Sequence, residues 1–448
     1  MSDTKNQEPI KKKSYKKAPL MPIHLRVFVA VVLGQIACGF ALGISGTALS
    51  NAAKYIHIND LWTGLIGAGA LIGLAGSLII GRISDKIGRR KLLMGNMYLL
   101  AIFSALNLLT SNLFLTFLLR IGVGLMLAID YTVGNALLTE WLPAGEDSKR
   151  QTQLLIYWTI GFIASYLTGI YVTGFGVYTW QVIFATGAIP ALIAALFRSI
   201  FPLPASPSWL ASKGKINKAN KLLKKHLGIK WVIPKRLKKA KTTKDSTWKI
   251  LLSKPYRRKV FVGGMFYACQ AFSFFGISIF LPILLQGMNI TDEKVSGIIY
   301  NGAMFLGILF GIFIFNKISR RVFLVSNFLI SSILITILSF GNHFNSITKL
   351  TIFSIFAIIL SSGLVLDYSY PTELFDIKVR GTGVGTCITI SRIGAAAGTF
   401  LLPILTTIGG SSLAMLVCGI VLFISFIICL IWAPETSPKF IKNNTQKG

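Results

Sequence analysis

Acidic residues are scarce in this chain. Only 15 of its 448 residues are aspartate or glutamate, against 46 lysines and arginines. Charged residues of both signs make up 14% of the chain, whereas a soluble protein would carry about a quarter. The mean hydropathy is +0.66, and apolar runs of about twenty residues recur, each long enough to cross a bilayer as a helix. The composition excludes a soluble globular protein and predicts a polytopic helical membrane protein.

Cysteine and histidine are also sparse. The five cysteines all fall in apolar runs and lack zinc-ligand spacing, and the four histidines lie outside those runs. The sequence holds no phosphate-cradling glycine loop. We therefore expect no metal, no cofactor, no disulfide and no histidine proton relay, and neither an enzyme nor a nucleotide-driven pump.

The formal net charge of +31 would suggest a nucleic-acid partner in a soluble protein. Here the positive residues precede the first apolar run or lie in alternate loops, and the opposite loops are short and nearly uncharged. This asymmetry predicts that both termini are cytoplasmic in the plasma membrane. The basic tail and loops are expected to touch anionic lipid rather than nucleic acid. The basic residues are Lys11, Lys12, Lys13, Lys16, Lys17, Arg89, Arg90, Arg320, Arg321, Lys378 and Arg380.

The apolar runs predict an all-α membrane protein with twelve transmembrane helices in two pseudo-symmetric six-helix bundles. We expect a basic tail over 1–26, a first bundle over 27–201, a lysine-rich cytoplasmic linker over 202–259, a second bundle over 260–432 and a C-terminal tail over 433–448. The predicted spans are 27–49, 61–80, 92–110, 113–139, 152–175, 180–201, 260–285, 296–315, 322–340, 350–370, 381–408 and 411–432.

The loop after the eighth span repeats the loop after the second. Asn-Lys-Ile-Ser-Arg-Arg at 316–321 matches Asp-Lys-Ile-Gly-Arg-Arg at 85–90, although the second copy lacks the acid and the central glycine. Duplicated halves of this kind place a substrate site near the bilayer midplane, between the halves.

The loop over 81–91 has the spacing G-x-x-x-D-K-x-G-R-R-K, and it resembles the loop after the second helix of the major facilitator superfamily of secondary transporters. The resemblance implies an ion-pair lock that closes the cytoplasmic mouth in one state and opens in the other. The alternative is that these residues only signal topology. The candidate gating residues are Gly81, Asp85, Gly88, Arg89, Arg90, Glu140, Arg150, Glu373 and Arg380.

Further motifs resemble the sugar-porter branch and its metabolite–proton symporter relatives. They include Arg-Ile-Gly-Val-Gly at 120–124, Tyr-Pro-Thr-Glu at 370–373 and Pro-Glu-Thr at 434–436. The chain departs from that branch at Ala41, where a proton-linked acid is usual, and across most of the seventh-span sugar signature, of which Gln270 and Pro282 remain. These departures weaken the case for sugar recognition.

Four charged residues stand out inside predicted spans, because a charge at a helix centre costs about 2.5–3.5 kcal/mol and so needs a reason. Arg392 lies near the midplane, and either anchors a substrate carboxylate through two parallel hydrogen bonds or closes an interhelical gate with an acid. Its surroundings resemble the eleventh span of organic-acid-transporting relatives. Arg120 and Gln270 are further substrate-binding candidates.

Asp130 and Asp367 are the two carboxylates expected inside spans, at near-equivalent positions of the two halves. Burial would bring their titration toward the range of proton exchange, so either is a candidate for proton coupling. The alternative for each is a structural pair with an arginine or a tyrosine.

We interpret the chain as a secondary active transporter, expected to be a monomer, that moves a small polar metabolite by alternating access. An organic anion moved with protons is favoured. The alternatives are a sugar or polyol transporter, working as a symporter or a uniporter, and a non-transporting membrane sensor of the same fold.

Overall fold

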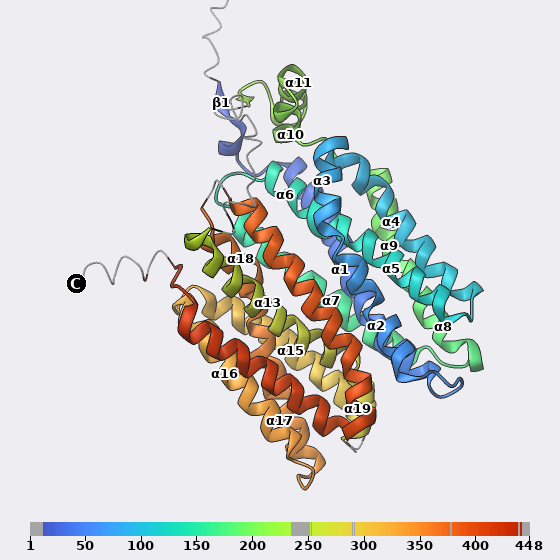
Figure 1. The fold of residues 1–448 in the computed structure, drawn as a ribbon. Coiled ribbons are helices and arrows are strands. Elements are labelled where there is room, and N and C mark those ends of the chain that lie inside the picture. The colour runs from blue at the N-terminus through green and yellow to red at the C-terminus, as the bar shows by residue number, and fades with distance from the viewer. Residues whose placement is uncertain are drawn as a thin grey trace, which may run out of the picture.

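The computed structural model of the protein describes residues 12–233, 251, 253–288, 290, 292–376, 379–437 and 440. Lys11, Lys378 and the side chain of Arg380 lie outside the described part. The described residues form two helical bundles, with a small cap at one end of the first (Figure 1). This confirms the predicted all-α membrane fold in two halves.

The first half contains nine α-helices and one π-helical turn within the described residues. They are α1 (Pro22–Ala52), α2 (Asp60–Leu74), α3 (Ser77–Ile87), α4 (Arg89–Ala105), α5 (Leu113–Ile129), the π turn (Asp130–Gly134), α6 (Asn135–Trp141), α7 (Asp147–Tyr171), α8 (Thr179–Ala185) and α9 (Ala188–Ile200). Short 3₁₀ turns occupy Tyr15–Lys17, Leu106–Leu109 and Gly176–Tyr178.

The second half and the linker complete the described elements. The second half has α13 (Lys254–Ile279), α14 (Leu281–Gly287), α15 (Glu293–Phe315), α16 (Arg320–Ser339), α17 (Ser346–Ser362), α18 (Leu364–Leu374) and α19 (Arg380–Trp432). The linker has α10 (Pro207–Ser212), α11 (Ile216–Leu227) and strand β2 (Trp231–Val232), which pairs in parallel with β1 (Lys13–Ser14).

Eleven helical stretches in the described residues are long and apolar enough to span a membrane. The last, Gly381–Trp432, has 52 residues, which at about 1.5 Å per residue is more than twice the thickness of a bilayer core. The backbone of α19 leaves helical geometry at Gly409 and at Gly410, whose φ of 68° suits a residue without a Cβ. The helix reverses direction there, so that it supplies the two predicted spans 381–408 and 411–432 (Figure 1).

Two spans are interrupted at corresponding places in the two halves. The fourth span changes to π-helical geometry over Asp130–Gly134, and the tenth is broken at Gly363, between α17 and α18. Such irregular turns inside helices often mark functional positions, since they redirect side chains. Asp130 and Asp367 lie in or just after these interruptions.

The halves meet closely at the end remote from the linker. A Cβ on Gly46 of α1 would overlap the Ile279 carbonyl of α13, and one on Gly297 of α15 would overlap the hydroxyl of Tyr166 in α7. At Gly46 only glycine allows the two backbones to approach this far, whereas the contact at Gly297 is with the end of a side chain. This end of the bundle is therefore sealed in the present conformation.

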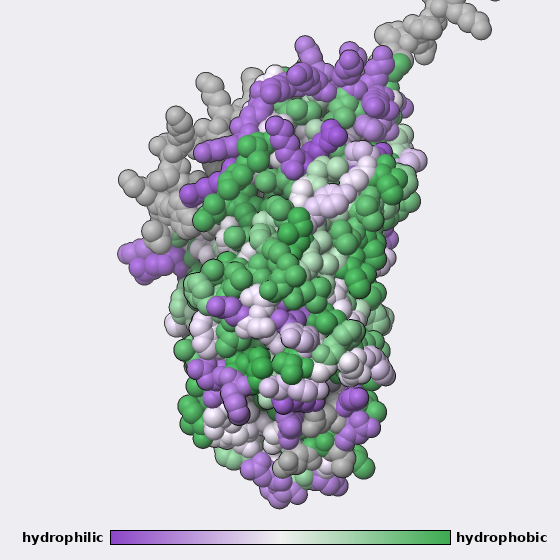
Figure 2. Space-filling model, turned by 90° about the vertical axis from the view of Figure 1, so that its right-hand side faces the viewer, coloured by the Kyte–Doolittle hydropathy of each residue, from purple (hydrophilic) through white to green (hydrophobic). Residues whose placement is uncertain are grey.

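A cap built from the N-terminal segment and the linker covers the opposite end of the first half. Tyr15 is fully buried, and its hydroxyl donates to the Glu140 carbonyl oxygen (3.1 Å) and lies 2.8 Å from Ser208 Oγ. Lys16 Nζ donates to the carbonyl oxygens of Thr139 and Leu142 at the end of α6. Figure 2 shows hydrophilic residues gathered at this end and hydrophobic ones over the middle of the face.

Candidate functional site

A cavity of about 480 Å³ lies between the two halves and opens at the end that carries the 81–91 loop. Asp85 lies in its lining near the mouth, Tyr131 and Asn135 line its wall, and Asp367 and Arg392 also line it. A recess of about 40 Å³ shares Tyr131, Tyr267, Asp367 and Arg392 with the cavity, and its other lining residues are aromatic or aliphatic. The cavity therefore joins the loop to the intramembrane charges.

Arg392 and Asp367 are brought together by the tertiary structure. Arg392 is buried in α19, and its guanidinium carbon lies 5.3 Å from the centre of the Tyr131 ring. It interacts electrostatically with Asp367 of α18, and its Nε has no hydrogen-bond acceptor in the described part of the chain. The Arg392 guanidinium therefore borders the cavity without a full set of acceptors.

Gln270 orients Asp367 rather than lining the cavity. With its amide oriented to suit both neighbours, Gln270 donates to Asp367 Oδ1 at 2.9 Å and accepts from the Leu364 N–H at 3.2 Å. The amide thereby ties the carboxylate to the start of α18. Gln270 thus contacts Asp367, and Arg392 interacts electrostatically with the same carboxylate. The sequence analysis singled out these three residues but did not predict their interactions.

Asp130 has a different environment from Asp367. It is completely buried inside the first half and forms a two-pronged ion pair with Arg198, with Nη2 to Oδ1 at 2.6 Å and Nη1 to Oδ2 at 3.0 Å. Asn96 donates to Oδ2 at 2.5 Å. A Cβ on Gly34 would overlap both partners. This geometry matches the structural alternative for Asp130, since the carboxylate faces the bundle interior.

Arg198 and Tyr131 were not singled out from the sequence. Arg198 lies near the end of the sixth span, where an arginine usually reaches water, and its partner is 68 residues away in the chain. Tyr131 follows Asp130 directly in the π-helical turn, so its side chain leaves the helix in another direction and lines the cavity. Asp130 could have indicated that both residues matter, because a carboxylate inside a span needs a partner. The side of the helix that each residue faces depends on helix rotation, which the sequence does not give.

Arg120 does not join this group. Its Nη2 donates to the Ala41 carbonyl oxygen at 2.8 Å and to Ser45 Oγ at 2.5 Å, and its guanidinium carbon lies 5.1 Å from the centre of the Phe184 ring. It is buried within the first half and is absent from the lining of the cavity. Arg120 is therefore placed to tie its span to α1.

Several candidate gating residues of the first half cluster at the cavity mouth. Arg89 pairs with Asp85 at 2.8 Å and with Glu140 at 3.3 Å. Gly88 has a φ of 96°, and the Trp209 ring of α10 packs against it. Gly81 lines the cavity, and Arg90 is exposed.

The second half contains a matching pair. Arg320, 231 residues after Arg89, lies 3.5 Å from Glu373. The tail residue Glu435 accepts from the Arg320 and Arg321 backbone N–H groups at 3.1 and 3.2 Å and so caps α16. Arg150 stands apart from both clusters, with Glu146 3.6 Å away.

The fold and this arrangement of a central cavity between duplicated halves define a secondary transporter. A family model for "Sugar (and other) transporter" matches residues 27–446. The chain belongs to this family of the major facilitator superfamily, and it is a multi-pass membrane transporter of small molecules rather than an enzyme.

Similar proteins cover nearly the whole chain. The inner membrane metabolite transport protein YgcS of Escherichia coli is 28% identical over 419 residues, 93% of each chain. The cis,cis-muconate transport protein of Acinetobacter baylyi is 24% identical over 91% of this chain and 94% of its own. A partially occluded inward-open structure of the xylose transporter XylE from E. coli has a TM-score of 0.76 at 16% identity, covering 92% of this chain and 98% of that one.

Proposed function

We propose that the protein moves a small organic anion across the plasma membrane together with protons, by alternating access and as a monomer. The observation that carries the proposal is that Arg392 and Asp367 line the same cavity between the halves. One is a permanent cation and the other a titratable acid, so that the pair can take up a proton and a substrate anion together.

The proposed cycle uses these two groups in turn. While Asp367 is ionised, its charge compensates Arg392. A proton that enters from outside neutralises Asp367, and the guanidinium is then free to bind a substrate carboxylate through two parallel hydrogen bonds. Release of both substrate and proton on the cytoplasmic side restores the initial pair. Coupling is assigned to Asp367 in preference to Asp130 because Asp130 already has Arg198 as its partner.

The aromatic recess supports a substrate with an apolar body. Trp158, Phe274 and Phe275 line it, with ring centres 5.2 to 6.2 Å apart. The Trp158 Nε1–H is buried without an acceptor in the described residues, and would suit a second acceptor on the substrate. The relatives include a cis,cis-muconate transport protein and a niacin transporter, both named for carboxylic acids.

The ion pairs at the mouth support the proposed gate. The Arg89–Glu140 and Arg320–Glu373 pairs repeat the same contact between a loop and the end of a span in the two halves. We propose that the mouth faces the cytoplasm, together with both termini, and that these clusters meet across it when the cavity closes. Labelling of an introduced cysteine tests the orientation: position 343 should react from outside and position 230 should not.

Uptake into proteoliposomes tests the substrate and the coupling. The probes are labelled cis,cis-muconate, nicotinate, glucose and xylose. For a carboxylate that is transported, Arg392→Lys should weaken binding roughly ten- to a hundredfold, because an ammonium lacks the planar fork. Asp367→Asn should retain counterflow and lose uphill uptake driven by a pH gradient.

Two outcomes would contradict this assignment. Unchanged substrate affinity in Arg392→Lys would show that Arg392 does not anchor the substrate carboxylate. Retained pH-driven uphill uptake in Asp367→Asn would assign the coupling to another group, such as Asp130, whereas a parent protein without such uptake would be a uniporter.

A sugar or polyol is the second candidate. Uncharged polar side chains, among them Asn135, Gln151 and Thr389, line the cavity and would suit hydroxyl groups. In that case xylose or glucose would be transported, and Arg392→Lys would change their affinity little.

A further inference from the structure

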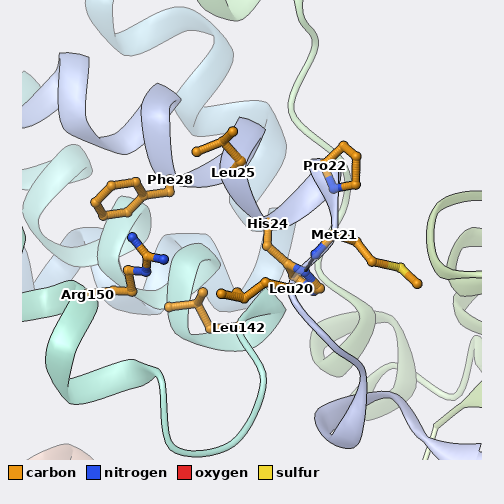
Figure 3. Close-up of a pocket in the computed structure, with 8 residues that line it drawn as sticks. All are labelled: Leu20, Met21, Pro22, His24, Leu25, Phe28, Leu142 and Arg150. Carbon is orange, nitrogen blue, oxygen red and sulfur yellow. Dashed lines mark hydrogen bonds between the residues drawn. The ribbon is translucent and has the colours of Figure 1, made fainter.

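A second pocket, of about 380 Å³, lies at the end of the bundle that carries the N-terminal lysines (Figure 3). One wall comes from the chain that leads into α1 and from the first turns of α1. The other comes from Leu142, just after α6, and Arg150 in the first turn of α7. The pocket lies apart from the central cavity, with which it shares no lining residue.

His24 lines this pocket and carries an unused donor. The Met21 backbone N–H donates to His24 Nδ1 at 2.8 Å, so Nδ1 is the acceptor and the proton of the neutral ring must be on Nε2. Nε2 is buried and has no partner among the described residues, although His24 is only 1% exposed. A buried donor left unpaired costs about 1–3 kcal/mol, which a bound acceptor would recover.

Arg150 places a cation at the same pocket. Its guanidinium carbon lies 5.0 Å from the centre of the Phe28 ring, which Figure 3 shows beside it. Arg150 Nη1 donates to Gln153 Oε1 at 3.1 Å, and Nε lies 3.6 Å from Glu146 Oε2, an ion-pair distance that is too long for a hydrogen bond. Because a guanidinium has five N–H donors, these contacts leave donors of Arg150 for a ligand.

The remaining walls are apolar and partly open. Leu20 and Leu25 are 51% and 62% exposed although they border the pocket, and Phe28 and Leu142 extend the apolar surface. Exposed leucines beside a cation suit an amphiphile at the boundary between headgroups and acyl chains. A small inorganic anion would use the two donors and leave the apolar walls without a role.

We propose that this pocket binds an anionic phospholipid of the cytoplasmic leaflet. The phosphate accepts from Arg150 and from His24 Nε2–H, and an acyl chain lies along Leu25 and Phe28. The assignment to the cytoplasmic leaflet depends on the orientation proposed above, whereas the binding chemistry does not depend on it. Because Arg150 and Leu142 flank the connection from α6 to α7, bound lipid also holds the end of α6, which carries the gate residue Glu140.

Lipid titration of delipidated protein in detergent tests the site independently of orientation and transport. The probes are phosphatidylglycerol, phosphatidylcholine and inorganic phosphate, and binding is followed by native mass spectrometry. The variants are His24→Phe, which keeps an aromatic ring without the donor, and Arg150→Gln. The matched control is Lys17→Gln, which removes an exposed charge at the same end of the bundle but outside the pocket.

Phosphatidylglycerol should bind the parent protein at least about tenfold more tightly than phosphatidylcholine. Each pocket variant should weaken that binding roughly ten- to a hundredfold, while Lys17→Gln changes it less than about threefold. Circular dichroism and thermal unfolding show whether a variant is folded, and Arg150→Gln decides the result if His24→Phe is not. An equal loss of lipid affinity in Lys17→Gln would show that the lipid is held by diffuse electrostatic attraction rather than by this pocket, and would overturn the proposal. Full competition by inorganic phosphate, or equal binding of both lipids, would also overturn the proposal.

Discussion

Replacing Gly46 with alanine should shift the transporter toward the state in which the sealed end is open. In the present conformation the new Cβ would overlap the Ile279 carbonyl oxygen and lie 2.5 Å from its carbon. Ordinary carbon–carbon contacts are about 3.5–4.0 Å, so α1 and α13 must separate by roughly 1 Å or more. The obstacle is rigid backbone, and it disappears when the halves part.

Overpacking of this kind costs about 1–3 kcal/mol. If only the present state bears that cost, the equilibrium constant between this state and the state in which the sealed end is open shifts by a factor of about 5 to 150. A cysteine at Thr389, which lines the cavity, reports the state through its reaction with an impermeant maleimide from the cavity side. The five native cysteines are buried and would be replaced first.

Gly302→Ala is the matched control, because a Cβ there meets no atom within 4 Å. Labelling of the Thr389 cysteine should slow in Gly46→Ala by up to the factor above and remain at the parent rate in Gly302→Ala. Equal labelling rates in the two variants would refute the reasoning that the close approach of α1 and α13 seals this end.

Three further substitutions have defined outcomes. Asp130→Leu and Arg198→Met should each lower the unfolding temperature more than the double variant does, because removing one partner strands a buried charge at about 3–5 kcal/mol; a double variant as unstable as the worse single would contradict this. Burial raises the pKa of Glu435, but hydrogen bonds from the Ser319 hydroxyl and nearby backbone N–H groups lower it overall, below its usual value. Its stabilising effect is therefore present above about pH 4.3 and lost as the pH falls through the lower folded-state pKa, so the difference in thermal stability from Glu435→Gln should shrink only in that acidic range. Asp85→Asn should slow counterflow more than it weakens equilibrium substrate binding, and equal counterflow rates in the variant and the parent would remove Asp85 from the gate.

The location of the spans and the duplication could be predicted from the sequence. The length of an apolar run decides whether it can cross a bilayer, and this is a local property that needs no knowledge of neighbours. The reversal of α19 at Gly409 and Gly410 falls in the gap between the predicted spans 381–408 and 411–432, where glycine tolerates backbone angles that other residues avoid. Arg392 and Asp367 stood out because a charge at membrane depth is costly.

The partners of those charges were decided only by the tertiary structure. Asp130 and Asp367 occupy similar places in the two halves, yet Asp130 pairs with Arg198 inside a bundle while Asp367 faces the cavity. Which way each points depends on the rotation of its helix and on residues far along the chain. The sequence by itself determined where charges enter the membrane. Packing between helices determined which of them are neutralised and which stay available to a ligand, because that depends on contacts that no local pattern encodes.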